Sequence, residues 1–241
     1  MKPEVEQRSV IYTAILGGYD NVAFHPSEVQ LEKYRFILFS DRIIRAPGWE
    51  LVKISTMQPA LCNRRIKMFP WEHMDARHCF YIDGHVFLGE RYHELFSSLM
   101  QSEEVFAVQR HRQGGNVGAE LIRCIDNRKL KKEAIQRVLD FGIDTKQIAV
   151  ECGFIYRDSQ SDLVRAHAQS WWRLFNSCCP RDQLIVWQAA IEAGLNIKTL
   201  NCSFNDSSNY LKVGRHKGAR LRSISGRLSL ARKALLTGLV F

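Results

Sequence analysis

Long apolar runs and paired cysteines are both missing from this sequence of 241 residues. One of its longest apolar stretches, residues 184–195, is interrupted by Gln188 and Glu192 and falls short of the roughly 18 to 20 apolar residues that span a membrane. The first ten residues show no apolar segment typical of a secretory signal peptide. The seven cysteines form no CxxC motif, so we expect reduced thiols in a cytoplasmic protein and no structural zinc site.

Glycine-rich phosphate-binding motifs are also missing. The apolar segment at 9–20 ends in "LGGYD" without a GxGxxG pattern, and the chain has no Walker A pattern. This disfavours a dinucleotide-dependent oxidoreductase and a P-loop enzyme. Hydrophobic residues make up 46% of the chain, which indicates a globular core rather than a disordered protein.

Acidic residues are absent from Arg215 to the end, although that stretch is rich in lysine and arginine and the chain carries a net charge of +9. Its basic and apolar residues alternate at roughly helical spacing. The pattern fits a basic amphipathic helix on an anionic membrane surface, or a helix that packs on the domain with its basic face in water. Nucleic acid is a less favoured partner because no aromatic-rich binding motif is present. We therefore expect a domain over 1–218 and a basic tail over 219–241.

Apolar segments with strand character alternate with segments of helical periodicity. We expect strands at 9–20, 34–41, 49–55, 79–88, 104–111, 148–159 and 195–201. We expect helices at 63–74, 91–101, 117–142, 162–176 and 181–194, the third closed by Gly142 and the last by Gly194. This alternation predicts an α/β fold with a mostly parallel central sheet covered by helices on both faces.

Polar residues follow several of these strands. They are Tyr19 and Asp20, Asp41, Asp83 and His85, and Arg157 and Asp158. In open parallel sheets, ligands bind outside the carboxyl ends of the strands. We therefore expect these side chains to line one cleft.

The segments "IYTAILGGYD", "FILFSD", "NRRIKMFP", "YIDGHV", "ECGFIYR", "WW" and "RDQL" occur in this order over about residues 9–218. This ordered set resembles a family of glycosyltransferase-like domains found in bacterial polysaccharide loci and in plant cell-wall proteins of the mucilage and pectin type. The resemblance implies a GT-A fold, a Rossmann-like nucleotide-diphospho-sugar domain. It also implies transfer of a hexosyl or related sugar from a nucleotide-diphosphate donor to a glycan or lipid-linked acceptor. The setting would be the synthesis of a cell-surface polysaccharide, such as lipopolysaccharide or capsule, at the inner face of the membrane.

The resemblance also implies a divalent cation, Mn²⁺ or else Mg²⁺, held by an acid-x-acid motif at a strand end. Here that motif reads Asp83-Gly84-His85, with an imidazole in place of the second acid, and His216 is in place for a third ligand. Oxygen and imidazole ligands suit Mn²⁺. The alternative is that Asp83 and Gly84 form a turn and that His85 is a surface residue.

Donor-binding positions follow from the same resemblance. They are Thr13, Ala14, Tyr19 and Asp20 for the base and ribose, Asp41 for the base, and Arg64, Lys67 and Gln183 for the diphosphate and sugar. Arg64 and Lys67 are three residues apart, on one face of a helix. The alternatives are a capping role for Asp41 and a solvated basic face for the two cations.

Two acids are candidates for catalysis. Asp182 opens a helix, where a carboxylate is also a common start signal, and would act as general base or hold the donor sugar. Glu151 lies in an apolar strand, where an acid must be paired or reach a cleft. Glu120 and His111 are further candidates for the same cleft, although Glu120 also suits an exposed helix position.

The pair Trp171-Trp172 has two interpretations, namely core packing or one ring stacked on a sugar. The leading functional prediction is a metal-dependent glycosyltransferase that is cytoplasmic or peripheral on the inner membrane. The alternative is a non-catalytic module of the same fold that binds a polyanion or an anionic membrane through its basic tail.

Overall fold

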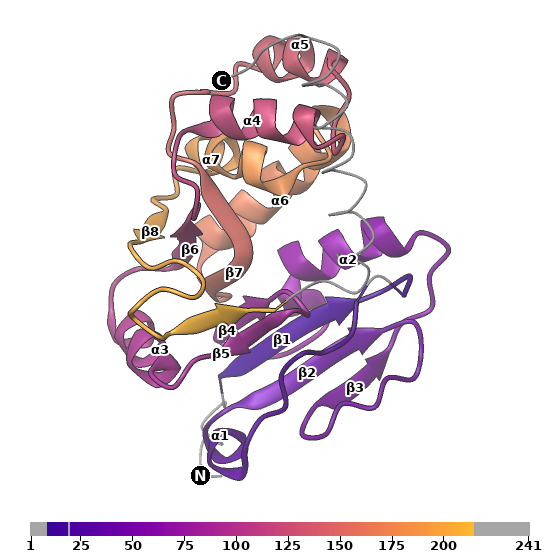
Figure 1. Cartoon of the computed structure of the whole chain (residues 1–241), viewed down its shortest axis with the longest axis vertical. Helices are drawn as coiled ribbons and strands as arrows, with labels where there is room; N and C mark the ends of the chain where they lie inside the picture. The colour runs from indigo at the N-terminus through magenta and orange to yellow at the C-terminus, as the bar shows by residue number, and fades with distance from the viewer. Residues whose placement is uncertain (1–8, 19, 215–241) are drawn as a thin grey trace, which may run out of the picture.

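The computed structural model describes residues 9–18 and 20–214 (Figure 1). Tyr19, His216 and the basic tail over 219–241 therefore lie outside the described residues. A seven-stranded sheet in the order β3-β2-β1-β4-β7-β6-β8 forms the centre of the molecule, and β5 pairs with β9 in a small second sheet. The expected α/β fold with a mostly parallel sheet is confirmed.

The strands and helices follow the sequence closely. The strands are β1 (Val10–Ile15), β2 (Arg35–Ser40), β3 (Glu50–Lys53), β4 (His78–Ile82), β5 (Val86–Leu88), β6 (Phe106–Arg110), β7 (Val150–Asp158), β8 (Lys198–Leu200) and β9 (Leu211–Val213). The helices are α1 (Glu28–Lys33), α2 (Pro59–Met68), the 3-10 turn η1 (Pro70–Glu72), α3 (Tyr92–Gln101), α4 (Val117–Asp126), α5 (Glu133–Asp140), α6 (Asp162–Ser177) and α7 (Asp182–Ala193).

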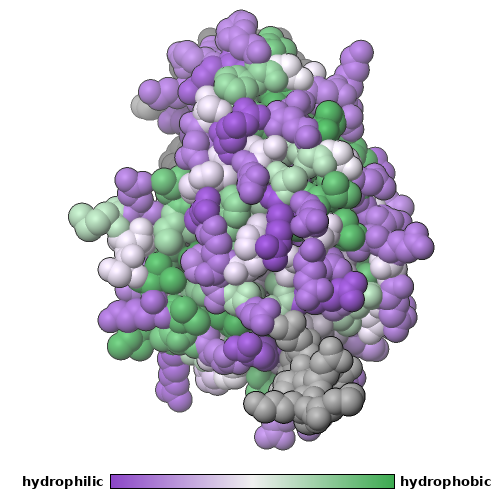
Figure 2. Space-filling view, turned by 180° about the vertical axis from the view of Figure 1, so that it is seen from behind, coloured by the Kyte–Doolittle hydropathy of each residue, from purple (hydrophilic) through white to green (hydrophobic). Residues whose placement is uncertain are grey.

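Side chains of the central strands alternate between two apolar layers, because successive residues of a strand point to opposite faces. In β1, Val10, Tyr12 and Ala14 join one layer, which also includes residues of α2, α4, α6 and α7. Ile11 and Ile15 join the other layer, which includes the buried side of α3. Both faces of the sheet are therefore buried, as a mostly parallel sheet requires. On the face shown in Figure 2, apolar side chains occur in small groups among polar ones.

The segment at 79–88 is not one strand. It forms the end of β4, a turn and then β5, which leaves the main sheet to pair with β9. The expected helix at 117–142 is likewise two helices. Asn127 ends α4, and Arg128 adopts a positive φ of 55° before α5 begins. The intervening residues 127–132 are mostly polar or basic, so they offer little apolar surface that would hold a continuous helix on the core.

The direction of β7 corrects the expectation of a single cleft that includes Arg157 and Asp158. β7 pairs with β4 in antiparallel fashion, with His78 opposite Asp158 and Ile82 opposite Phe154. The end of β7 therefore lies at the amino end of β4, away from Asp83. Arg157 is buried there and donates a hydrogen bond from Nη1 to the Tyr12 hydroxyl at 2.9 Å. Hydrophobic periodicity does not encode strand direction, so the sequence pattern could not separate the two cases.

Candidate functional site

The carboxyl ends of the parallel strands β1, β2 and β4 meet at one edge of the sheet. The turn after β4 holds Asp83, Gly84 and His85 and is closed by a hydrogen bond from Val86 N to the Asp83 carbonyl at 2.8 Å. A Cβ at Gly84 would lie 2.7 Å from Cδ1 of Ile15. A larger residue between the acid and the histidine would therefore displace the Ile15 side chain, because the turn packs directly on the end of β1.

The Asp83 carboxylate is oriented by the strand that precedes it and by β7. The buried Tyr81 donates its hydroxyl proton to Asp83 Oδ1 at 2.7 Å. A Cβ at Gly153 of β7 would lie 3.2 Å from Asp83 Oδ2, so the glycine leaves space beside the second oxygen. The backbone N–H of Asp83 also bonds the Gly153 carbonyl at 2.9 Å. One oxygen is thus held by the protein, and the other one faces Gly153, where the Phe204 ring lies 3.3 Å from the same Cβ position.

His85 lies next to an acid from the loop after β1. Its Nδ1 is 3.8 Å from Asp20 Oδ2, and both side chains are mostly buried. Within residues 9–18 and 20–214, no three His, Cys, Asp or Glu side chains gather as a metal-binding group. The described part of the chain therefore supplies Asp83 and His85 of the predicted ligand set, and His216 lies outside it.

Asp182 forms a buried charge cluster, which we call the Asp182 cluster, with Arg64, Lys67 and Arg181. Its Oδ2 accepts a hydrogen bond from Lys67 Nζ at 2.6 Å and lies 3.8 Å from Arg64 Nε. Burial alone raises the pKa of Asp182, but Lys67, Arg64 and Arg181 outweigh it and hold that pKa well below its usual value. Asp182 is therefore ionised at neutral pH and is a weak proton acceptor.

Lys67 joins the Asp182 cluster to the Asp83 turn. Its side chain is 2% exposed, and its ammonium lies 4.8 Å from the centre of the Tyr81 ring. The alternative of a solvated basic face does not hold for this residue, because the face of α2 that carries Lys67 packs into the molecule. Arg64 is the more accessible cation, with 28% of its side chain exposed, and Asp182, followed by Tyr81 and Asp83, raises its pKa.

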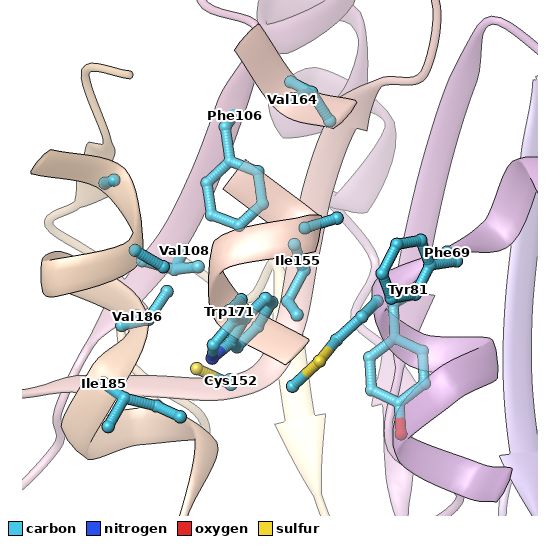
Figure 3. Close-up of a cluster of buried hydrophobic side chains, with 14 of the residues drawn as sticks. Phe69, Tyr81, Phe106, Val108, Cys152, Ile155, Val164, Trp171, Ile185 and Val186 are labelled. Atoms are coloured by element: carbon cyan, nitrogen blue, oxygen red, sulfur yellow. The ribbon is translucent and has the colours of Figure 1, made fainter. Parts of the chain in front are cut away.

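Tyr81 and Cys152 belong to the apolar cluster that also contains Trp171 (Figure 3). Both side chains interact electrostatically with Asp83 and with Asp182. Burial, reinforced by Asp182 and Asp83, raises the pKa of the Cys152 thiol, so this cysteine stays protonated. Trp171 donates from Nε1 to the Asp182 carbonyl at 3.1 Å. The sequence reading missed Tyr81, although the two-residue period of a strand places it on the same face as Asp83.

The expected donor-binding residues near β1 and β2 are mostly engaged within the protein. The Ala14 carbonyl accepts a hydrogen bond from Asn63 Nδ2 at 2.6 Å, and Asp41 Oδ2 accepts one from Gly17 N at 2.7 Å. Gln183 accepts from Arg181 Nη2 at 2.8 Å. Thr13 is buried, and its hydroxyl has no partner among the described residues. Ala14 and Asp41 thus lie near the carboxyl ends of the neighbouring parallel strands β1 and β2, with Asp41 closing the loop that follows β1, whereas Gln183 lies on α7.

Glu151, Glu120 and His111 form a second group, which we call the His111 cluster. His111 Nε2 lies 3.4 Å from Glu120 Oε2 and 3.8 Å from Glu151 Oε1. Burial lowers the pKa of His111 although both acids oppose that effect. Glu151 also accepts a hydrogen bond from Arg112 N at 3.1 Å, and Glu120 pairs with Arg123 at 2.8 Å. The expectation that Glu120 is an exposed helix acid is wrong, because the side chain packs against His111.

Comparisons with known proteins concern the fold. No protein-family model matches the chain, and no curated protein matches its sequence. The apo structure of the bifunctional glycosyltransferase WbbM matches with a TM-score of 0.50 and 8% identity, over 83% of this chain and 40% of WbbM. The chain thus spans less than half the length of that protein.

Two further solved structures give similar alignments. The galactosyltransferase LgtC, in complex with donor and acceptor sugar analogs, matches with a TM-score of 0.45 and 10% identity, over 81% of this chain and 74% of LgtC. Mouse xyloside xylosyltransferase 1 in its apo form gives 0.47 and 9%, over 82% and 86%. At such low identity a likeness concerns the fold alone. The chain has the mixed α/β fold, with a mostly parallel sheet flanked by helices, that GT-A glycosyltransferases such as WbbM share.

Proposed function

We propose that this chain is a glycosyltransferase that moves a sugar from a nucleotide-diphosphate donor to a glycan or lipid-linked acceptor. The observation that carries the proposal is the connection of Asp83, Tyr81, Lys67 and Asp182 at the carboxyl edge of a GT-A fold. Ligands bind at this edge in open α/β sheets. Buried ionised groups that are held this firmly are more common at functional sites than elsewhere.

Arg64 is the best candidate for the donor diphosphate. It is the only one of Arg64 and Lys67 with substantial exposure, and its guanidinium can bind phosphate oxygens in a bidentate manner. Lys67 would not contact the donor, because it is buried. Its hydrogen bond to Asp182 would hold that carboxylate in position. Thr13, Asp20, Asp41 and Gln183 remain candidates for contacts to the base, the ribose and the sugar.

A divalent cation, Mn²⁺ or Mg²⁺, is part of the proposal. Asp83 and His85 would hold it, and their carboxylate and imidazole are the donor types that this role needs. A carboxylate and an imidazole suit Mn²⁺. When bound, the cation would neutralise charge on the diphosphate leaving group. His216 stays the proposed third ligand.

Asp182 is better suited to hold the donor sugar than to act as general base. A good general base has a pKa near the working pH, and that of Asp182 is held well below its usual range. Its ionised oxygens accept hydrogen bonds from cations and could accept them from sugar hydroxyls. Glu151 and His111 are the candidates for contacts to the acceptor.

The proposed cellular setting is the cytoplasmic face of the membrane, where the basic tail would contact anionic lipid. Among the described residues, no helix is long and apolar enough to cross a membrane. The lipid contact is testable on its own by comparing the full chain with a chain that ends at residue 218, using vesicles with and without anionic lipid.

Calorimetry with UDP, GDP, CDP and dTDP, each with and without Mn²⁺, tests the proposal. We expect one nucleotide to bind in a manner that needs both the metal and Asp83. The Asp83→Ala variant should lose at least tenfold in affinity, as expected for loss of a metal ligand. Asp75→Ala is the matched control, because Asp75 is an exposed acid on the loop before β4.

Absence of binding for all four nucleotides would reject the glycosyltransferase. Salt-sensitive binding to any polyanion, with no effect of nucleotide, would instead favour the non-catalytic binding module. Metal-dependent nucleotide binding that persists in Asp83→Ala would be consistent with a glycosyltransferase. It would show that the metal is not bound by the turn at Asp83.

A further inference from the structure

A groove of about 310 Å³ lies on the surface between α6 and the segment that runs from the end of α2 through η1. Arg65, Phe69, Trp71 and Glu72 form one side. Arg165, Gln169 and Trp172 form the other side. None of these residues belongs to the Asp182 cluster or the His111 cluster.

Helix geometry separates this groove from the candidate donor site. Arg64 and Arg65 are consecutive residues of α2, so their side chains point about 100° apart around the helix axis. Arg64 reaches Asp182, whereas Arg65 pairs with Glu72 and lies over the Phe69 ring at 3.8 Å. Trp171 and Trp172, which are consecutive residues of α6, also point to different sites. Trp171 is 1% exposed and bonds Asp182, and the half-buried Trp172 lines the groove.

The α6 side of the groove is a continuous stripe. Arg165, Gln169 and Trp172 are spaced by four and three residues, which places them on one face of the helix. This face offers a cation, an amide and an aromatic ring in a row. Such a combination suits a sugar chain, because an aromatic ring packs on the C–H face of a pyranose while amides and guanidinium groups bond its hydroxyl and carboxyl groups.

Arg165 gives the groove a preference for negative charge. Its Nε donates to the Ser159 carbonyl at 3.1 Å, and its guanidinium carbon lies 5.5 Å from the centre of the Trp71 ring. No acidic group among the described residues forms an ion pair with it, whereas Arg65 is neutralised by Glu72 in two hydrogen bonds. The guanidinium is therefore held in place, with its terminal amino groups available for a carboxylate.

The aromatic rings of the groove are partly covered by neighbouring side chains. Trp172 is stacked on Phe175 at an interplanar angle of 11°, and the Arg65 guanidinium carbon lies 5.3 Å from the centre of the Trp172 ring. The Phe69 ring meets Trp71 at 73° and Trp172 at 83°, edge to face. Trp71 and Trp172 are both half-buried groove residues, so part of each side chain is left for contact with a sugar.

We propose that this groove binds an acidic glycan, with a uronic acid carboxylate on Arg165 and a sugar ring against Trp172. The ligand would be part of the acceptor or of the growing product, so its biological meaning rests on the proposed function. The binding itself does not depend on that function, and the two are tested separately.

The test uses calorimetry with tetrasaccharides of known charge. The acidic probes are a hyaluronan tetrasaccharide and a mannuronate tetrasaccharide, and chitotetraose is the neutral control. We expect at least one acidic probe to bind and chitotetraose to bind at least tenfold more weakly. Arg165→Gln should lower the affinity for the acidic probe roughly tenfold, because it removes a charge-assisted bidentate contact. Trp172→Ala should lower it by a similar or larger factor.

Arg173→Gln is the matched control, because Arg173 lies on the same helix, pairs with Glu192 and is outside the groove. It should leave binding unchanged. Thermal melts of all variants identify any loss of folding, and Arg165→Gln keeps the test valid if Trp172→Ala is unstable, since Arg165 is exposed.

Three outcomes would overturn the proposal. They are no binding of either acidic probe, acidic-probe binding that Arg165→Gln leaves unchanged, and UMP binding that Trp172→Ala abolishes. Metal-dependent nucleotide binding at Asp83 is measured on the same samples. Binding of the acidic probe without any nucleotide binding would support the glycan-binding groove and contradict the glycosyltransferase proposal. Nucleotide binding without binding of an acidic probe would contradict only the proposal about the groove.

Discussion

The Asp182 cluster and the His111 cluster both bury carboxylates, but they stabilise them in different ways. Asp182 faces three cations, and the nearest, Lys67, is 2% exposed. In the His111 cluster, Glu151 is bonded by a backbone N–H and lies near Arg112, whose side chain is 54% exposed. Glu120 pairs with Arg123, which is 27% exposed, and with a histidine whose pKa is lowered by burial.

The difference shows which charges the fold depends on. In the Asp182 cluster, both partners are removed from water, so each is costly without the other. In the His111 cluster, the arginines keep contact with solvent, which weakens each pair and makes its loss tolerable. We therefore expect the first cluster to be rigid and permanently ionised, and the second to be adaptable.

Removal of Asp182 should have the largest effect on stability. Asp182→Ala leaves the Lys67 ammonium buried without its carboxylate, which typically costs about 3–5 kcal/mol of the free energy of unfolding. Urea unfolding measures this change. The double variant Asp182→Ala/Lys67→Met should recover much of the loss, because it removes both charges. A loss below about 1 kcal/mol in Asp182→Ala would show that water reaches Lys67 and would contradict the contrast between the clusters.

Mild acid should destabilise the protein through a residue outside both clusters. His167 is fully buried against Phe106 and Trp171, and burial lowers its pKa to about 3. The unfolded chain protonates this histidine near its ordinary value of about 6.5. Between these two values the unfolded state binds the additional proton, so the free energy of unfolding should fall as the pH is lowered from 6.5 towards 3.

The slope of stability against pH checks this expectation. In that window the His167→Gln variant should show a shallower slope by up to about 1.4 kcal/mol per pH unit. His111→Gln should change the slope less, because Glu120 and Glu151 oppose the effect of burial on its pKa. If His167→Gln and His111→Gln changed the slope of the free energy of unfolding against pH equally, the two histidines would not differ in their contribution to acid stability.

Tyr81→Phe should separate positioning of Asp83 from packing. The variant keeps the ring over Lys67 but removes the hydroxyl that bonds Asp83, so the stability loss should be only about 1 kcal/mol. Metal-dependent nucleotide affinity should fall by about tenfold, since groups that orient a metal ligand contribute on this scale. Tyr34→Phe is the control, because Tyr34 is a buried tyrosine of the opposite apolar layer. Unchanged metal dependence in Tyr81→Phe would mean that Asp83 needs no such support.

Glu120→Gln should have the smallest effect. The variant keeps the shape of the side chain and weakens pairs with Arg123 and His111, so we expect a loss of about 0.5–1 kcal/mol in urea unfolding. Glu133→Gln, at an exposed position on α5, should change stability even less. If Glu120→Gln lowered the free energy of unfolding as much as Asp182→Ala does, the two clusters would contribute equally to stability, and the contrast between them would be wrong.

The fold was largely predictable, because local periodicity decides it. Continuous apolar runs placed β1, β2 and β4, and Asp182 and Gly194 correctly marked the two ends of α7. The missed features were of another kind. The antiparallel direction of β7, the break after Asn127 and the pairing of β5 with β9 all depend on contacts between distant segments. No local pattern specifies such contacts.

The candidate site was predictable only in part. The position of Asp83 after a buried strand and of Asp182 at a helix start indicated which acids to consider. Their environments were not visible, because Lys67 and Asp182 are 115 residues apart in the chain and meet at 2.6 Å. The sequence therefore left open whether Lys67 is solvated, and the surroundings of Tyr81 and Cys152 were missed.

The sequence by itself indicated most of the strands and helices, the covering of both sheet faces and the acids that follow the strands, since each of these follows from the order of neighbouring residues. Only the tertiary structure decided that Asp182 is permanently ionised, that Glu151 faces His111, and that Trp171 and Trp172 belong to different sites. The physical reason is that charge state and exposure depend on what surrounds a side chain in space. In this chain those surroundings come from segments that folding alone brings together.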